Sequence, residues 1–417
     1  MIVSVGRLTK FDRLCFWFIV IDNLFLPYFW AKCISYSFPV IFIWYLQRHQ
    51  VLSTLGYYSR KPIKIILACC VISTLVGIVL YPQYATDDIA GCMGMISALL
   101  TLLFFIYVRS VTDETHLQKV HKYLFFFICF ACLFSFVYYY SPDLYFNLKY
   151  VFNARADDSF SVDAYTNTVR FGYYWSDENN IGYMTCAVAM FLFVSRYITL
   201  TQKFLVLMMS VLICVATMSS GALITLGLAF VFFVRYVLLG NESKINTFFK
   251  ICIIFFFVAV AIFAVSYLLN SEIYQLMLIR LEGKESAGDG RTEIYKDVLS
   301  RINLWQYILL GTGSRTIIGG ASKSPHNILL HLTIAYGMIV CVLYMWTVYK
   351  KDRHQKIKYW LWRTPVFLGM FVNILITEDK LNILIMLLIA FELGTNKARP
   401  IKKRQLSSTN QYSLPSQ

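Results

Sequence analysis

The chain contains repeated runs of about 20 residues without a charged side chain, and these runs limit its fold more than any other feature. Residues 89–108 and 180–195, for example, contain no Asp, Glu, Lys or Arg. One helical crossing of a lipid bilayer takes about 20 mostly apolar residues. Only 15% of the residues are charged and 58% are hydrophobic, whereas soluble domains have roughly 25% charged residues. We therefore predict an all-α integral membrane protein.

The apolar windows predict about twelve transmembrane helices and two long loops. The predicted spans are residues 14–30, 33–46, 64–81, 89–108, 122–140, 180–195, 203–218, 222–239, 250–269, 326–349, 361–376 and 381–395. They divide the chain into N-terminal transmembrane helices (1–140), a first long loop (141–179), central transmembrane helices (180–269), a second long loop (270–325), C-terminal transmembrane helices (326–395) and a disordered tail (396–417). The first two spans are close enough in the chain that a re-entrant pair is an alternative.

The distribution of charge predicts the orientation. Positive residues concentrate on the cytoplasmic side of membrane proteins. With both termini cytoplasmic, 26 of the 38 Lys and Arg residues lie on that side, and 16 of the 23 acidic residues lie on the other, where both long loops are. The net charge of +15 then indicates contact with anionic membrane lipid and gives no reason to expect a nucleic acid.

The second long loop carries an amphipathic pattern. Apolar residues recur every three or four positions over residues 294–309, with Lys296, Asp297 and Arg301 between them. This pattern is typical of a helix that lies on the membrane surface. Residues 283–290, just before it, are polar and contain glycine, as a mobile lid would. A spacer over the bundle is the alternative.

His326 is the candidate catalytic residue. It lies between Pro325 and Asn327, where the second long loop runs into apolar sequence. Histidine titrates near neutral pH, so an imidazole at the membrane edge can take a proton from a substrate or return one. The alternative is an interfacial histidine that is hydrogen-bonded to a loop carbonyl.

Three arginines are candidate ligands for a phosphate group. Arg170 precedes the span in which Asn179 and Gly182 are expected on the first helical turn, and backbone amides at a helix start attract anions. Arg291 and Arg315 lie in the second long loop. A guanidinium binds phosphate oxygens in a bidentate manner. Solvation, or for Arg170 pairing with a nearby acidic residue, is the alternative.

Few polar groups interrupt the predicted spans. Asp22 with Asn23 is the main one, either a functional acid or a neutral acid bonded to a neighbouring helix. Glu392 can extend its carboxylate to the cytoplasmic surface, and Lys380 belongs to an outside turn before the last span. The cysteines lie in or beside apolar segments without the spacing of a metal site, so we expect no metal, no cofactor and no disulfide.

These motifs, taken in order, resemble the O-antigen ligase and O-antigen polymerase superfamily of bacterial envelopes. The matching residues are Arg170, Gly172, Asn179, Gly182, Gly290, Arg291, Gly311, Gly313, Pro325, His326, Asn327 and Gly337. The chain departs from the family pattern at Asp177-Glu178-Asn179, where many members have Asn-Pro-Asn, and at Ser219-Ser220-Gly221, where many have Ser-Arg-Gly. Arg315 or Lys323 would replace the arginine that is absent at Ser220.

The resemblance implies a glycosyltransferase of the bacterial inner membrane. The substrate would be an oligosaccharide on undecaprenyl diphosphate, with the arginines holding the diphosphate at the periplasmic face. His326 would act on the acceptor hydroxyl or help seat the diphosphate. We expect a polysaccharide polymerase, with a chain-length regulator protein as a further partner. An O-antigen ligase is the first alternative, a transporter or flippase for lipid-linked sugars the second, and a membrane scaffold the third.

Overall fold

The structure is a computed structural model that describes a large part of the chain. The described residues are 8–28, 34–48, 57–111, 114–152, 171–173, 178–240, 307–313, 317–318, 321–322, 327–351, 355–372 and 379–392, with isolated residues at 275, 279, 296, 299, 300 and 303. Its helices are α1 (Lys10–Phe25), α2 (Ser37–Arg48), α3 (Tyr57–Leu80), α4 (Ala85–Val111), α5 (Glu114–Tyr140), α6 (Pro142–Phe152), α7 (Glu178–Phe193), α8 (Leu200–Ala216), α9 (Ser220–Phe233), α13 (Ile328–Tyr336), α14 (Met338–Tyr349), α15 (Arg363–Val372) and α16 (Asp379–Phe391). Short 3-10 turns cover Pro82–Tyr84 and Ile357–Tyr359, a π-helical turn covers Val234–Leu238, and two-residue strands β1 (Ile317–Ile318) and β2 (Ala321–Ser322) pair antiparallel.

The predicted helical membrane fold agrees with this structure in its main feature. Four helices of the described part are long and apolar enough to cross a membrane: Lys61–Leu80, Pro82–Val111, Glu114–Tyr140 and Ser220–Leu238. Shorter apolar helices, such as α8 and α14, accompany them. The chain is therefore a multi-pass membrane protein, while the number of twelve spans and the sidedness of the loops stay predictions.

Two local features differ from the expected pattern. Where one span is expected over 326–349, two helices meet at Gly337, whose φ of +100° lies in the region that favours glycine. The first long loop begins with the helix α6 rather than with irregular chain. Of the expected surface helix over 294–309, the isolated described residues 296, 299 and 300 are helical and residues 307–309 form turns, and most of the rest lies outside the described residues.

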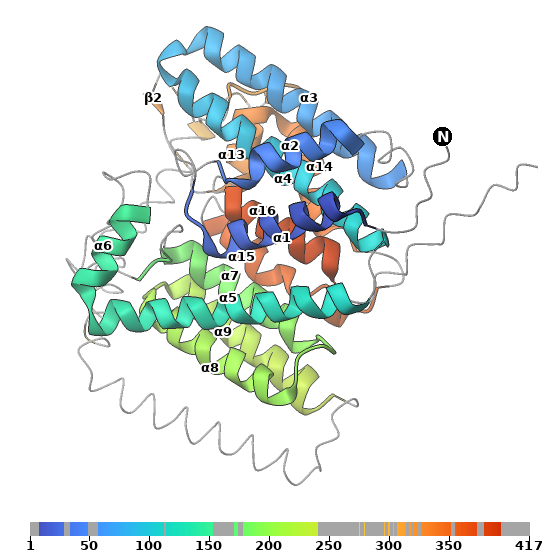
Figure 1. Cartoon of the computed structure of the whole chain (residues 1–417). Coiled ribbons are helices and arrows are strands. Elements are labelled where there is room, and N and C mark those ends of the chain that lie inside the picture. Colours follow the sequence, from blue (N-terminus) through green and yellow to red (C-terminus); the bar gives the residue numbers. More distant parts are fainter. Residues whose placement is uncertain are drawn as a thin grey trace, which may run out of the picture.

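The helix α4 is packed among several helices in one half of the bundle. Its most extensive contact is with α16, and it also packs against α3 and α2. The helix α7 packs against α8, α9 and α15 in the other half of the bundle, and α5 covers α8. Figure 1 shows α6 and β2 at the left end and the start of α1 at the opposite end. We call the end with α6 and β2 the loop-bearing end.

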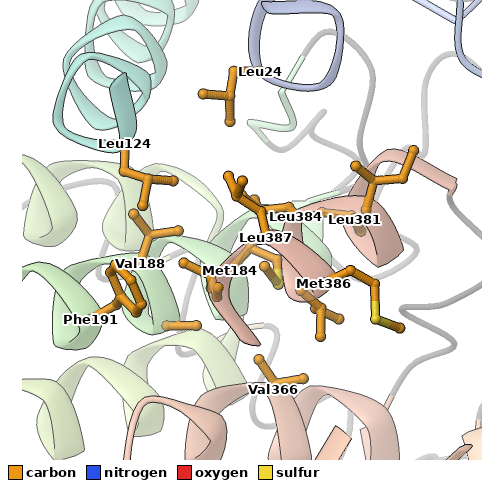
Figure 2. Packing of buried hydrophobic residues seen from close by; sticks show 14 of the residues in the cluster. Leu24, Leu124, Met184, Val188, Phe191, Val366, Leu381, Leu384, Met386 and Leu387 are labelled. Atoms are coloured by element: carbon orange, nitrogen blue, oxygen red, sulfur yellow. The ribbon is translucent and has the colours of Figure 1, made fainter. Parts of the chain in front are cut away.

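The hydrophobic core joins these two halves through α16. Leu384 and Leu387 of α16 belong to one buried cluster with Met184 and Val188 of α7 (Figure 2). The opposite faces of several helices carry exposed large apolar residues, for example Val79, which is 79% exposed. A helix in a lipid bilayer is expected to turn such residues toward the acyl chains.

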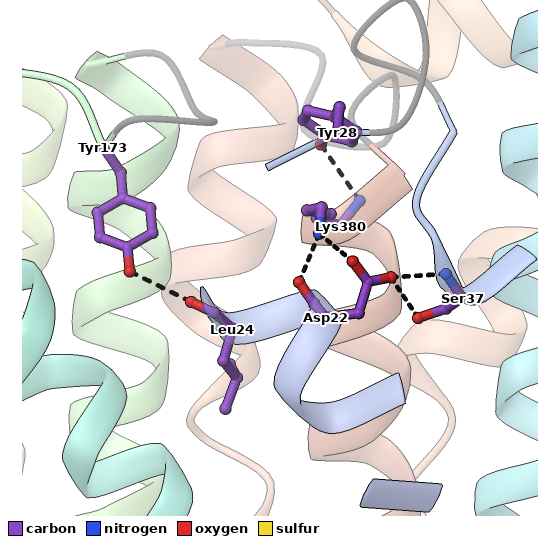
Figure 3. Close-up of polar contacts among 6 residues, drawn as sticks. All are labelled: Asp22, Leu24, Tyr28, Ser37, Tyr173 and Lys380. Atoms are coloured by element: carbon purple, nitrogen blue, oxygen red, sulfur yellow. Dashed lines mark hydrogen bonds and ion pairs between the residues drawn. The ribbon is translucent and has the colours of Figure 1, made fainter. Parts of the chain in front are cut away.

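Buried ion pairs hold α16 at both ends. Near its start, the Lys380 ammonium lies 2.8 Å from the Asp22 carboxylate of α1, and Ser37 donates from its backbone and hydroxyl to the same carboxylate (Figure 3). Just after its end, Glu392 pairs with Arg363 of α15, and both side chains are buried. The prediction that Glu392 extends to the cytoplasmic surface is therefore wrong, because Arg363 supplies a buried partner.

Candidate functional site

The segment 171–173 is fixed to the loop-bearing end by backbone hydrogen bonds. The Phe171 N–H donates to the Ala216 carbonyl at the end of α8, over 3.2 Å. The Gly172 N–H donates to the Tyr145 hydroxyl of α6, and that hydroxyl donates back to the Gly172 carbonyl, over 2.9 and 3.0 Å. These buried bonds place the residue after Arg170 at the end of α8. Arg170 itself lies outside the described residues.

Tyr173 ties the same segment to α1. Its hydroxyl donates to the Leu24 carbonyl over 3.2 Å, in the last turn of α1 and two residues after the ion-paired Asp22 (Figure 3). Its ring is buried edge-on against Phe127 and Phe134 of α5. The segment that follows Arg170 thus contacts four helices: α1, α5, α6 and α8.

The expected glycine at the start of α7 packs against another helix. A Cβ atom on Gly182 would lie 2.4 Å from the Cβ of Ala222 in α9, so only glycine fits there. Asn179 is half-buried on the first turn of the same helix. Gly182 therefore lets the starts of α7 and α9 approach each other, which is a packing role.

The turn between α8 and α9 is the place where many family members carry an arginine. Here Ser219 caps α9, its hydroxyl accepting from the Ala222 N–H, and Met218 before it has a φ of +48°. A Cβ atom on Gly221 would lie 1.8 Å from the Tyr183 hydroxyl of α7. The Ser219 hydroxyl and the Tyr183 side chain therefore lie against this turn, and Ser220 adds no positive charge to it.

The break between α13 and α14 is filled by the segment 308–313. The Ile339 N–H donates to the Ile308 carbonyl over 3.3 Å, and a Cβ atom on Gly337 would lie 2.6 Å from the Leu309 carbonyl oxygen. Because Gly337 has no side chain, the backbone of Leu309 can pack directly against it. Irregular backbone at membrane depth is tolerated where other protein groups satisfy it.

The Gly311–Gly313 turn satisfies the carbonyls at the end of α13. The Thr312 N–H donates to Ile334 over 2.9 Å, and the Gly313 N–H donates to Ala335 over 3.0 Å. The last turn of a helix leaves carbonyls without partners inside the helix, and this turn supplies two of the donors. The Gly-x-Gly motif is therefore part of the junction at which segment 308–313 packs against the break between α13 and α14 at Gly337. We call this junction the helix joint.

Helices α3 and α4 hold the other side of this turn. The Ser73 hydroxyl of α3 accepts from the Gly311 N–H over 3.0 Å. Gly313 has a φ of +104°, and a Cβ atom on it would lie 2.8 Å from the buried Asp88 carboxylate of α4. Neither Ser73 nor Asp88 was predicted from the sequence as part of the site. The pair Asp87-Asp88 directly before an apolar run was the signal that could have identified Asp88.

Asn327 begins α13. Its side-chain oxygen accepts from the N–H groups of Leu329 and Leu330 over 2.9 and 3.3 Å. The amide therefore caps the helix and fixes the direction of the chain just after His326. Gly313 and Asn327 are both attached to α13, and the β1–β2 hairpin lies between them in the sequence.

The four charged residues of the predicted site are not described by the structure. Arg170, Arg291, Arg315 and His326 lie outside the described residues, so their convergence on one site stays a prediction. The supporting residues are placed: Asn179, Gly182, Gly311, Gly313 and Asn327 belong to helix starts and to the helix joint. Within the described part of the chain, no group of three or more His, Cys, Asp or Glu side chains could hold a metal ion.

The chain is similar to a known protein family over part of its length. A family model described as O-antigen ligase matches residues 204–345. The matched region runs from α8 into α14 and includes the Gly311–Gly313 turn, whereas Asp88 and Arg170 precede it. No curated protein matches the chain significantly. The resemblance to the O-antigen ligase and polymerase superfamily is confirmed over this region.

Proposed function

From the match to the O-antigen ligase family, we propose that the protein is a glycosyltransferase that polymerises a bacterial surface polysaccharide. The donor is a glycan on undecaprenyl diphosphate, and the acceptor is a hydroxyl of another lipid-linked repeat unit. The observation that carries the proposal is the match over residues 204–345, because this region includes Arg291, Arg315 and His326.

The loop-bearing end faces the periplasm in this proposal. The charge distribution puts Lys and Arg on the side where the first predicted span begins, and Figure 1 shows the start of α1 opposite α6 and β2. Lipid-linked repeat units would therefore meet the helix joint and the segment 171–173 from the outer leaflet of the inner membrane.

The helix joint supports a common location for Arg315 and His326. Gly313 is bonded to Ala335 on α13, and Asn327 caps the same helix. Eight residues separate Asn327 from Ala335, which is about 12 Å of α-helix. Arg315 follows Gly313 by two residues and His326 directly precedes Asn327. Both ends of the intervening loop are thereby held by one short helix.

The chemistry needs fixed positive charge and one base. His326 takes the proton of the acceptor hydroxyl, whose oxygen forms a bond to the anomeric carbon of the donor glycan. The bond between that carbon and the diphosphate oxygen breaks, and undecaprenyl diphosphate leaves with the electron pair. Arg170, Arg291 and Arg315 neutralise the departing charge. Direct displacement inverts the anomeric centre.

The test is an assay of the purified protein with lipid-linked repeat units. His326→Ala and Arg291→Lys are each expected to lower the polymerisation rate on the order of 100- to 1000-fold, the usual cost of losing one electrostatic or proton-transfer group. Arg291→Lys keeps the charge but loses the bidentate fork. The matched controls are His116→Ala and Arg196→Lys, in α5 and just after α7, which are expected to keep the wild-type rate. Wild-type polymer length in both site variants would contradict the assigned roles.

An O-antigen ligase is the second candidate, because the matching family model is described by that activity. A ligase would transfer finished polymer to the lipid A core. A deletion strain separates the two functions. Lipopolysaccharide that carries single repeat units indicates a missing polymerase, whereas polymer that accumulates on the lipid carrier indicates a missing ligase.

A transporter for lipid-linked sugars is the candidate from a different class. Such proteins use ionisable groups within their spans for coupling. Asp22, Lys380, Arg363 and Glu392 are instead matched in two buried ion pairs. Movement of lipid-linked glycan across liposomes by the purified protein, without any change in glycan length, would replace the enzyme with a transporter.

A further inference from the structure

Asp88 is a buried carboxylate at the loop-bearing end. It lies in the first turn of α4 and has no exposed surface. Burial of a charged group is costly without compensation, and the start of a helix favours a negative charge. The chain therefore keeps an acidic side chain at a position where an apolar one would be easier to bury.

Two glycines from distant parts of the chain make room for this carboxylate. A Cβ atom on Gly313 would lie 2.8 to 2.9 Å from the carboxylate carbon and both oxygens of Asp88, and a Cβ atom on Gly77 would lie 2.9 Å from one of the oxygens. The same Cβ atom on Gly77 would also lie 2.3 Å from the Thr312 carbonyl oxygen. Helix α3, helix α4 and the Gly311–Gly313 turn thus fit together without a side chain at either glycine.

The turn is fixed on three sides by this arrangement. The end of α13 accepts from Thr312 and Gly313, Ser73 accepts from Gly311, and Asp88 lies against Gly313. Between Gly313 and Asn327, the structure describes the residues of β1 and β2. Arg315 follows Gly313 by two residues in the sequence, so the position of Gly313 sets where the chain leading to Arg315 begins.

We propose that Asp88 is a positioning residue for the glycosyl transfer, acting through Gly313 on the segment that carries Arg315 and His326. The inference rests on the proposed function. Its carboxylate limits where the turn can lie, and it places a negative charge against Gly313, two residues before the candidate ligand Arg315 in the sequence. A displacement of about 1 Å in a reacting group can cost on the order of a hundredfold in rate.

The first test compares Asp88→Asn with Asp87→Asn in the polymerisation assay. Asp88→Asn keeps the shape and removes the charge, and its neighbour in the same helical turn is the matched control. For Asp88→Asn we expect kcat to fall by about tenfold to a hundredfold while KM for the lipid-linked donor changes little, because donor binding is spread over several groups. For Asp87→Asn we expect wild-type values. Wild-type kcat in Asp88→Asn would overturn the proposal.

A double-mutant cycle tests whether Asp88 acts through the loop. In an Arg315→Ala background, Asp88→Asn is expected to lower kcat much less than it does alone, because effects that share one route are not additive. Fully multiplicative losses in the double variant would show that Asp88 does not act through the segment with Arg315, and would overturn the proposal.

Hydrogen exchange provides a readout that does not depend on activity. The Thr312 and Gly313 amides are bonded to α13, so we expect faster exchange of a peptide covering them in Asp88→Asn, with unchanged exchange in α8. Unchanged exchange at the turn would overturn the inference. A wild-type protein that does not extend lipid-linked glycan would instead overturn the proposed function, and faster exchange in the variant would still show that Asp88 holds the turn.

Discussion

Removal of the Lys380 charge is expected to destabilise the bundle strongly. The ammonium lies 2.8 Å from the Asp22 carboxylate, donates also to the Asp22 carbonyl, and neither side chain of the pair is exposed. Among the described residues, Lys380→Met would leave the buried carboxylate with the two Ser37 donors. Breaking a buried ion pair on one side typically costs about 3–5 kcal/mol. We expect a loss of that order in the free energy of unfolding.

The double variant Asp22→Asn/Lys380→Met isolates the electrostatic part. It removes both charges, while an asparagine oxygen can still accept from Ser37. Replacing a whole buried pair by neutral groups is often close to neutral in stability. We therefore expect the double variant to recover most of the loss, with a coupling between the two sites of about 2 kcal/mol or more.

The assay is denaturant unfolding of the purified protein in mixed micelles. The matched control is Arg196→Met, which breaks an ion pair with Glu114 whose two side chains are 62% and 73% exposed. Exposed pairs contribute about 0–1 kcal/mol. A loss of unfolding free energy in Lys380→Met no larger than that in Arg196→Met would refute a strong buried ion pair. So would a double variant whose loss equals the sum of the losses in Asp22→Asn and Lys380→Met.

Three further variants test the joints at the loop-bearing end. Gly221→Ala is expected to separate α7 from α9 and lower the unfolding temperature, because its methyl group would meet the Tyr183 hydroxyl, and the loss should shrink in a Tyr183→Phe background. Asn327→Ala removes a helix cap, so its free energy of unfolding should fall by about 1 kcal/mol, and an unchanged value would show that the cap is not used. Gly337→Ala places a side chain at a positive φ and against the Leu309 carbonyl. We expect the free energy of unfolding to fall by at least about 1–3 kcal/mol in the same micelle assay. An unchanged free energy of unfolding would contradict the expected strain at Gly337.

The helices themselves follow from local sequence. A run of apolar residues in a bilayer becomes helical because helical hydrogen bonds satisfy the backbone within one segment. The predicted spans 89–108 and 222–239 therefore coincide with α4 and with α9 plus its π-helical turn, whereas α5 begins at Glu114, eight residues before the predicted 122–140. The break at Gly337 was not, because one glycine in an apolar run does not show whether a second segment will occupy the space beside it.

Among the supporting residues of the site, local roles could be predicted from the sequence and long-range contacts could not. Asn327 could be placed before a helix because capping acts over three residues. The role of Gly313 could not be predicted, because its neighbour Asp88 lies far away in the chain and the two meet only when α3, α4 and α13 pack together. The positions of Arg170, Arg291, Arg315 and His326 stay predictions from the sequence.

The sequence by itself determined that this chain is a helical membrane protein, where most of its described apolar helices lie, and which family its second half resembles. Only the tertiary structure decided that Lys380 pairs with Asp22 across 358 residues, that α16 is held by ion pairs at both ends, and that the Gly-x-Gly turn completes a broken helix. Helix formation depends on residues within a few positions of each other, whereas these contacts depend on how separate helices pack.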